Sequence, residues 1–344
     1  MTAGTTGPRR PLPLRLPLLV APMAGGVTTP ELVAAVCAAG GSGFLPGGYL
    51  TAEQLGHNLA RLDELLDEQA MAAVPYGVNL FVPTPSDRQR DATAVLDYAD
   101  RLGEQAGQPR WNDDDHYTEK LHLLVEEHPV KMVSFTFGCP RPEDVQALHQ
   151  VGTRVLVTVT DRDEAQAAAG LGVDGLVVQG FDAGGHRGTH DVAKAPNHRD
   201  ALALLPELSH LDLPMVAAGG VATRGDVQRL LAAGAVAVQA GTAFLRCPEA
   251  GTSPAHRELL STAHGTRVTR AFSGRPARGL VNDFMERHED FAPSVYPQVD
   301  QVTKPLRAAA ASRGDSSQIS GWAGAGWSAA QDLPAGEVFA SLLP

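Results

Sequence analysis

The chain has 344 residues, 43% of them hydrophobic, and a formal net charge of −11 from 28 basic and 39 acidic residues. This length allows one large core or two modest ones. Without a lysine- or arginine-rich block, the sequence gives little support to nucleic-acid binding. No uninterrupted apolar segment is long enough for a signal peptide or a membrane span. We therefore expect a cytoplasmic protein without a membrane partner, and its oligomeric state stays open.

The cysteines and histidines do not form a recognisable metal or disulfide pattern. Cys37, Cys139 and Cys247 lie far apart and show no CxxC spacing, so neither a disulfide framework nor a zinc knuckle is expected. Cys37 and Cys247 sit in apolar patterns typical of core thiols. The 12 histidines form no HxH or HExxH pattern, and we expect no metal.

Eight short apolar runs, several rich in β-branched residues, predict buried strands. In chain order they span residues 18–24, 42–48, 74–81, 131–138, 154–160, 175–178, 214–220 and 235–245. Helical segments separate them. Thr29 and Pro30 supply an N-cap and a first helical residue, Thr51 opens the next helix, and residues 161–172 form an acid-started, alanine-rich helix. This alternation predicts an α/β fold, a (β/α)8 TIM barrel, with an open doubly wound sheet as the alternative.

The length of the chain exceeds that of a bare barrel. We expect residues 1–13 to be a disordered tail, residues 14–264 to form the barrel, and residues 83–130 to be an insert that is partly helical. The motif WNDDDHY at residues 111–117 resembles an exposed turn. Residues 265–344 carry several aromatic side chains beyond a complete barrel. They suit a lid over the barrel mouth or an oligomer contact, and we favour the substrate-binding lid.

The segment GLVVQGFDAGGHRGTH at residues 175–190 carries the candidate catalytic residue. His186 follows two glycines at the exit of the sixth predicted strand, where a ligand can approach the backbone closely. An imidazole in that place is a reasonable general base. A loop histidine beside a flexible turn is the alternative. The carboxyl ends of the other strands favour the catalytic interpretation, because unusual residues gather there and active sites of such barrels lie at that face.

The same strand ends predict a flavin site. Gly219, Gly220, Gly241 and Thr242 follow the last two strands, where barrels often bind phosphate through backbone amides. No GxGxxG or P-loop motif is placed after a strand. Flavin mononucleotide (FMN) fits best, because its ring needs amide partners and a close backbone approach. The residues proposed to meet these needs are the amides Asn79, Gln179 and Gln239 and the turn Pro22, Met23 and Ala24.

Taken together, five motifs resemble the nitronate monooxygenase family, formerly called 2-nitropropane dioxygenases, and its first class in particular. They are APMAGGVTTPEL, GVNLF, VVQGFDAGGHRG, AAGGVATRGDV and VQAGTAFL, and the resemblance covers roughly residues 14–325. It implies an FMN-binding barrel with a smaller substrate domain. It adds Gly184 and Ala240 to the flavin-holding residues, makes His186 the catalytic histidine, and places Tyr296 and Lys304 in the substrate pocket.

The resemblance implies oxidation of alkyl nitronates by dioxygen to carbonyl compounds and nitrite, with neutral nitroalkanes as further candidate substrates. Three positions depart from the family pattern. Ala325 stands where glutamine is usual, Asp300 where another aromatic residue is expected, and Asp182 where glutamate is usual. The departures at Ala325 and Asp300 make the identity of the substrate less certain than that of the flavin.

Other functions remain as alternatives at this stage. An FMN-dependent enoyl-acyl-carrier-protein reductase and an NAD(P)H:quinone reductase share similar glycine-rich and histidine segments. A non-catalytic flavin-binding barrel and a flavin-free barrel for sugar phosphates are the further alternatives.

Overall fold

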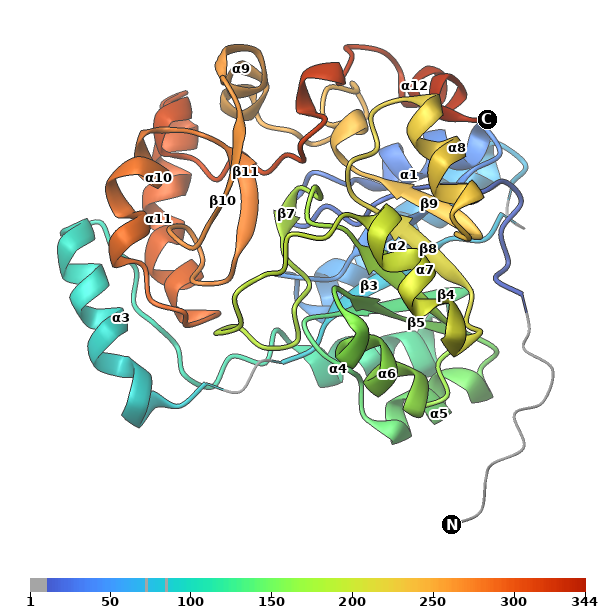
Figure 1. The fold of residues 1–344 in the computed structure, drawn as a ribbon, viewed down its shortest axis with the longest axis horizontal. Coiled ribbons are helices and arrows are strands. Elements are labelled where there is room, and N and C mark those ends of the chain that lie inside the picture. Colours follow the sequence, from blue (N-terminus) through green and yellow to red (C-terminus); the bar gives the residue numbers. More distant parts are fainter. Residues whose placement is uncertain (1–10, 72–73, 84–85) are drawn as a thin grey trace.

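The computed structural model describes residues 11–71, 74–83 and 86–344 (Figure 1). Most of the expected tail, residues 1–10, lies outside the described residues. Leu12 and Leu14, at the start of the described chain, pack against side chains that fill the barrel interior.

Within the described residues, eight parallel strands close into a barrel. They are β1 (Leu18–Val20), β2 (Ser42–Pro46), β3 (Gly77–Phe81), β4 (Met132–Thr136), β5 (Arg154–Val159), β6 (Gly175–Gln179), β8 (Met215–Ala218) and β9 (Ala237–Ala240). The last strand pairs with the first, with Leu19 opposite Gln239. Each strand coincides with one of the eight predicted runs, and the closure confirms the (β/α)8 barrel over the open sheet.

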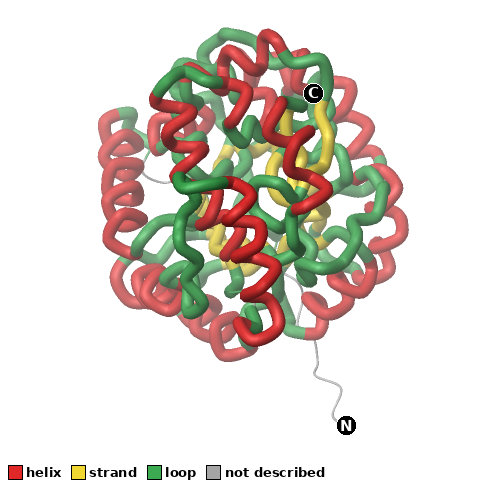
Figure 2. Tube along the Cα trace, turned by 90° about the vertical axis from the view of Figure 1, so that its left-hand side faces the viewer, coloured by secondary structure: helices red, strands yellow, loops and turns green. Residues whose placement is uncertain are grey.

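Helices surround the strands (Figure 2). They are α1 (Pro30–Ala38), α2 (Ala52–Glu68), α4 (Tyr117–His122), α5 (Pro142–Gln150), α6 (Arg162–Gly170), α7 (Ala201–Leu208) and α8 (Arg224–Ala232). The predicted N-caps are confirmed, because Thr29 accepts from the Leu32 amide and Thr51 forms a capping box with Gln54. Local sequence therefore determines where α1 and α2 begin.

A smaller lobe stands beside the barrel, on the left in Figure 1. Its antiparallel sheet has the order β10 (Thr266–Thr269), β11 (Ala277–Leu280) and β7 (Gly185–His186). Helices α10 (Asp283–His288) and α11 (Gln298–Ser312) follow in sequence. Helix α3 (Arg88–Leu102), from the insert, packs against α11 through Val95 and Tyr98. Residues far apart in the chain thus build one lobe.

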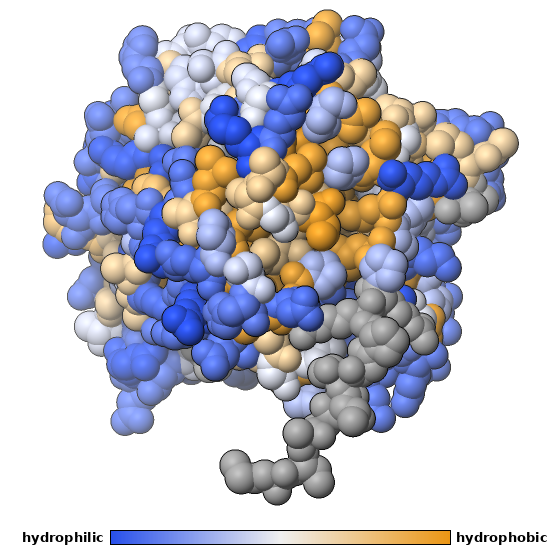
Figure 3. All heavy atoms as spheres, turned by 45° about the vertical axis from the view of Figure 1, so that its right-hand side comes forward, coloured by the Kyte–Doolittle hydropathy of each residue, from blue (hydrophilic) through white to orange (hydrophobic). Residues whose placement is uncertain are grey.

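Two further helices complete the C-terminal half. Helix α9 (Pro254–Thr262) follows the barrel, and α12 (Ala335–Leu342) returns to pack on α1 and α8. On the face shown in Figure 3, hydrophilic side chains surround a patch where apolar side chains gather.

The structure corrects one prediction about the insert. The motif at residues 111–117 is not wholly an exposed turn, because the Tyr117 side chain is buried and Asp115 is half-buried. Tyr117 donates its hydroxyl proton to Asp144 at the start of α5, and Asp115 forms an ion pair with Lys120. Sequence polarity misled here because Asp115 is paired with the buried Lys120, although Asp114 and His116 are exposed.

Gly77 is a position where the barrel interior allows no side chain. A Cβ there would lie 2.4 Å from the Phe44 ring and 2.9 Å from the carbonyl oxygen of Met132. We expect Gly77→Ala to lower the free energy of unfolding by about 1–3 kcal/mol, because the packed ring must shift. Gly170→Ala is the matched control, since no atom lies within 4 Å of its Cβ position. Urea unfolding measures both, and equal effects of the two variants would contradict this account of the packing.

Candidate active site

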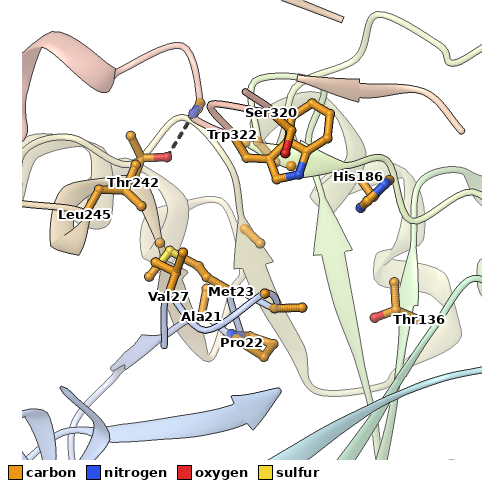
Figure 4. A pocket seen from close by; sticks show the side chains of 18 of the residues that line it. Ala21, Pro22, Met23, Val27, Thr136, His186, Thr242, Leu245, Ser320 and Trp322 are labelled. Atoms are coloured by element: carbon orange, nitrogen blue, oxygen red, sulfur yellow. Dashed lines mark hydrogen bonds between the residues drawn. The ribbon is translucent and has the colours of Figure 1, made fainter. Parts of the chain in front are cut away.

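A cavity of about 510 Å³ opens at the carboxyl ends of the barrel strands. Figure 4 shows Pro22 and Met23 at its floor, Ser320 and Trp322 above them, and Thr242 and His186 at opposite sides. Fourteen of the fifteen residues predicted for the site line it: Pro22, Met23, Ala24, Asn79, Gln179, Gly184, His186, Gly219, Gly220, Gln239, Ala240, Gly241, Thr242 and Lys304. The structure therefore brings together residues from five barrel strands or the loops after them, and from α11.

The glycine cluster on one side of the cavity offers a set of backbone donors. The N–H groups of Gly184, Gly219, Gly220 and Gly241 find no hydrogen-bond acceptor among the residues described. Gly219 and Gly220 have φ values of +102° and +71°, which glycine adopts without strain. Several unpaired N–H groups around one concave surface are suited to an anion such as phosphate.

Close backbone packing explains why this cluster is built from glycine. A Cβ at Gly184 would lie 2.5 Å from the amide nitrogen of Gly324, and one at Gly219 would lie 2.9 Å from that of Ala183. The Thr242 hydroxyl accepts a hydrogen bond of 2.9 Å from the Gly324 amide (Figure 4). The C-terminal segment is thereby fastened to the loop after β9, and it closes this side of the cavity.

The three predicted amides differ in how freely they face the cavity. Asn79 donates through Nδ2 to Ser134 and Thr136, and within the described structure its Oδ1 has no partner. The Gln179 amide is occupied, since Oε1 accepts from the Gly188 amide and Nε2 donates to the His186 carbonyl. The side chain of Gln239 makes no hydrogen bond to any described residue. Asn79 and Gln239 therefore retain groups for a ligand, whereas Gln179 mainly holds the loop that carries His186.

His186 lies on β7, where it pairs with Ala277 of the smaller lobe. Its Nε2 lies 2.9 Å from the Ser273 hydroxyl. The rings of Phe137, Tyr296 and Trp322 lie around the imidazole, at centroid distances of 5.7, 5.7 and 5.4 Å. Burial, aided by the charges of Arg275 and Arg307, lowers the pKa of His186 to about 3. The imidazole is therefore neutral at physiological pH, with an unprotonated ring nitrogen.

Three cationic side chains, Arg275, Lys304 and Arg307, lie at or near this end of the cavity. Arg275 is fully buried, with its guanidinium 4.0 Å from the centroid of the Phe137 ring. Burial lowers the pKa of Arg275 to about 10, which leaves it charged at neutral pH. Arg307 pairs with Asp300 at 2.7 Å. Lys304 is exposed at the rim and forms no ion pair within the described chain.

Tyr296 is the one predicted site residue that does not line the cavity. It is buried behind the cavity wall, and its hydroxyl donates to that of Tyr49 at 3.4 Å. Tyr49 does line the cavity, and sequence reasoning missed it. It also missed Phe137 and Ser273. The glycine pair before Tyr49 at the end of β2 was the available signal for a functional loop, whereas Ser273 had none.

The described residues contain no cluster of three or more histidine, cysteine, aspartate or glutamate side chains arranged to hold a metal ion. The three cysteines are free thiols. In the described part of the chain, each helix is too short or too polar to cross a bilayer.

Fold and cavity together define a (β/α)8 barrel in which glycine N–H groups without acceptors and a neutral histidine line one pocket. The model of the family described as nitronate monooxygenase matches residues 13–344. The chain belongs to this family, and it is therefore a flavin-dependent oxidoreductase.

Relatives support the assignment over nearly the whole chain. The nitronate monooxygenase of Pseudomonas aeruginosa is 38% identical, over 97% of each chain. That of Paraburkholderia phytofirmans is 35% identical, over 98% of this chain and 94% of its own. The structure of nitroalkane oxidase from Streptomyces ansochromogenes superposes with a TM-score of 0.88 at 42% identity, covering 96% of this chain and 95% of its own. FabK from Thermotoga maritima, at 24% identity and a TM-score of 0.73 over 96% of this chain and 92% of its own, shares the fold.

Two buried histidines predict the direction of acid destabilisation. Burial lowers the pKa of His186 to about 3 and that of His256 to about 4, from an ordinary value of 6.5. Below pH 6.5 the unfolded chain binds protons that the folded chain excludes, so stability falls as the pH falls towards these values. Each group accounts for roughly 2 kcal/mol between about pH 7.5 and pH 5.

We expect His186→Asn and His256→Asn each to reduce the difference in unfolding free energy between these two pH values. His57→Asn, exposed on α2, is the matched control. Thermal unfolding at the two pH values measures the effect. An acid sensitivity equal to wild type in both variants would contradict the burial of these two histidines in the neutral form.

Proposed function

We propose that this protein binds FMN non-covalently in the cavity and oxidises alkyl nitronates with dioxygen. The observation that carries the proposal is the convergence of two features on one pocket: four glycine N–H groups without acceptors at one side, and a neutral histidine at the other. The N–H groups suit the FMN phosphate, and Thr242 and Ala240 complete that side. The turn Pro22, Met23 and Ala24 and the free amides of Asn79 and Gln239 suit the flavin ring.

The reaction requires little covalent chemistry from the protein. The bound flavin supplies the acceptor for electrons from the nitronate, a resonance-stabilised carbanion. Two nitronates and one dioxygen balance to two carbonyl compounds and two nitrite ions. The chain's own task is to orient the substrate, exclude water and control one proton. The aromatic rings around His186 help to exclude water, because they separate the imidazole from solvent.

The hydrogen bond between His186 and Ser273 supports Nδ1 as the reactive nitrogen in this proposal. The Ser273 hydroxyl donates to the Arg275 carbonyl at 3.2 Å, so its oxygen accepts from Nε2–H of His186 at 2.9 Å. This leaves the proton-accepting lone pair on Nδ1, which has no hydrogen-bond partner among the described residues. His186 Nδ1 then takes the α-proton of a neutral nitroalkane, or hydrogen-bonds the protonated form of a bound nitronate.

The smaller lobe supplies the substrate side of the pocket in this proposal. Lys304 at the rim attracts anionic substrates, and Tyr296 supports the cavity wall from behind. We propose residues 14–264 as the flavin-binding unit and residues 265–344 as the substrate-binding region. Within that division α3 adds to the substrate-binding side and α12 packs on the barrel.

The first test of the proposed function uses the purified protein. We expect a visible flavin spectrum, release of FMN on heat denaturation, and nitrite release when ethyl nitronate is added under air. The glycine donors and the ring-facing amides account for retention of the flavin. Release of FAD would overturn the assignment of FMN as the cofactor. A flavin-loaded protein that releases no nitrite would overturn the proposed oxidation of nitronates.

The second test separates two roles of His186. General base catalysis typically contributes about 10²–10⁴-fold, and His186→Asn removes the proton acceptor while keeping a polar group. We expect this variant to retain FMN and to lose turnover of nitroethane by about that factor. Ethyl nitronate has already lost its proton, so its oxidation should change far less. Equal losses on both substrates would show that His186 positions the substrate and is not the base.

A further inference from the structure

The loop after β2, which begins with Gly47 and Gly48, packs closely against the end of β3. The Gly47 amide donates to the Asn79 carbonyl at 2.7 Å, and a Cβ at Gly47 would lie 2.9 Å from that same oxygen. A Cβ at Gly48 would lie 2.3 Å from the Phe81 ring. Neither position accepts a side chain, so Tyr49 is the first residue of this loop that extends a side chain to the cavity.

Tyr49 holds a backbone conformation that tyrosine rarely adopts. Its φ is +67°, in the left-handed region, where a bulky residue is strained. Such strain persists only when surrounding contacts enforce it. The enforcing contact is a hydrogen bond of 2.8 Å from the Tyr49 amide to Oδ1 of Asp115.

A buried ion pair from the insert holds this loop at two points. Lys120 is 1% exposed, and its Nζ donates to the Gly47 carbonyl at 2.8 Å and to Oδ2 of Asp115 at 2.7 Å. Asp115 in turn accepts the Tyr49 amide. The pair therefore holds the loop both before and at Tyr49. Burying the charge of Lys120 carries a desolvation cost, which is consistent with a role of the pair in fixing one conformation.

The Tyr49 hydroxyl retains a proton for a ligand. The Tyr296 hydroxyl lies 3.4 Å from the Tyr49 oxygen, a long contact for two hydroxyl groups, which leaves the Tyr49 proton available to a ligand. Burial raises the pKa of Tyr49, with Asp300 adding to the effect, and the phenol stays protonated. The ring of Tyr296 contacts the imidazole of His186 at a centroid distance of 5.7 Å. Tyr49 and His186 thus flank Tyr296 and face the same cavity.

We propose that the Tyr49 hydroxyl hydrogen-bonds an oxygen of the substrate's nitro or nitronate group, and that the Asp115–Lys120 ion pair positions it. The inference rests on the proposed function and adds a substrate-contacting residue to it. A nitronate carries its negative charge on two oxygens, and a hydrogen bond to a charged acceptor is stronger than a neutral one. In this arrangement Tyr296 does not contact the substrate itself, and it affects substrate binding by contacting the hydroxyl of Tyr49.

The test is the conservative variant Tyr49→Phe, which keeps the ring packed on Phe81 and removes only the donor. We expect KM for ethyl nitronate to rise about 10- to 100-fold, with kcat changed less than about threefold and FMN content unchanged. Binding of 2-methyl-2-nitropropane, which has no α-proton, should weaken in a flavin-absorbance titration. Tyr76→Phe is the matched control, because that hydroxyl bonds Asp63 away from the cavity.

The positioning role is tested with Asp115→Asn alone and combined with Tyr49→Phe. The asparagine side chain would keep an oxygen for the Tyr49 amide but lose the charge that holds Lys120. We expect the single variant to raise KM several-fold and to add nothing when Tyr49 is already replaced by phenylalanine. Equal KM effects in both backgrounds would overturn the positioning role, and a Tyr49→Phe enzyme with wild-type KM and ligand binding would overturn the inference. A wild-type enzyme inactive on ethyl nitronate would instead overturn the proposed function.

Discussion

The pairing of two residues of β7 with β11 is the constraint on which the pocket depends. Gly185 and His186 leave the loop after β6 and join the sheet of the smaller lobe opposite Arg278 and Ala277. One short segment therefore belongs to both halves of the molecule. It holds the imidazole over the barrel mouth, and Gln179 secures the same segment from the barrel side through the His186 carbonyl. In the proposed mechanism, the position of the general base is thus set by backbone hydrogen bonds, which do not depend on side-chain flexibility.

Much of this arrangement is readable from sequence because it is local. Buried parallel strands are short apolar runs, and their helices begin at caps such as Thr29 and Thr51, so the alternation specifies a barrel before any tertiary contact is known. Barrel topology then brings the carboxyl ends of strands together. Residues at those ends, including Asn79, Gln239 and His186, meet in one cavity for that reason.

What the sequence does not predict arises from contacts between distant segments. Strand β7 is only two residues long, and its partner lies about ninety positions further along the chain, so neither periodicity nor propensity marks it. Tyr49 is held in position by its hydrogen bond to Asp115, which pairs with Lys120. The charges of these two residues suggested that they would be exposed to solvent. Gln179 has the expected place but its amide is used by the protein itself. A residue's position on a strand was predictable, whereas the partner of its side chain was not.

The claim at the centre of this account is that a nitronate is the electron donor to the flavin of this barrel. Anaerobic rapid mixing tests it directly, by following the absorbance of the oxidised flavin after addition of ethyl nitronate in one experiment and of NADH in another. The account predicts rapid loss of that absorbance with ethyl nitronate and a much slower change with NADH. Rapid loss with NADH and none with ethyl nitronate would contradict it, and would assign the barrel to a reductase.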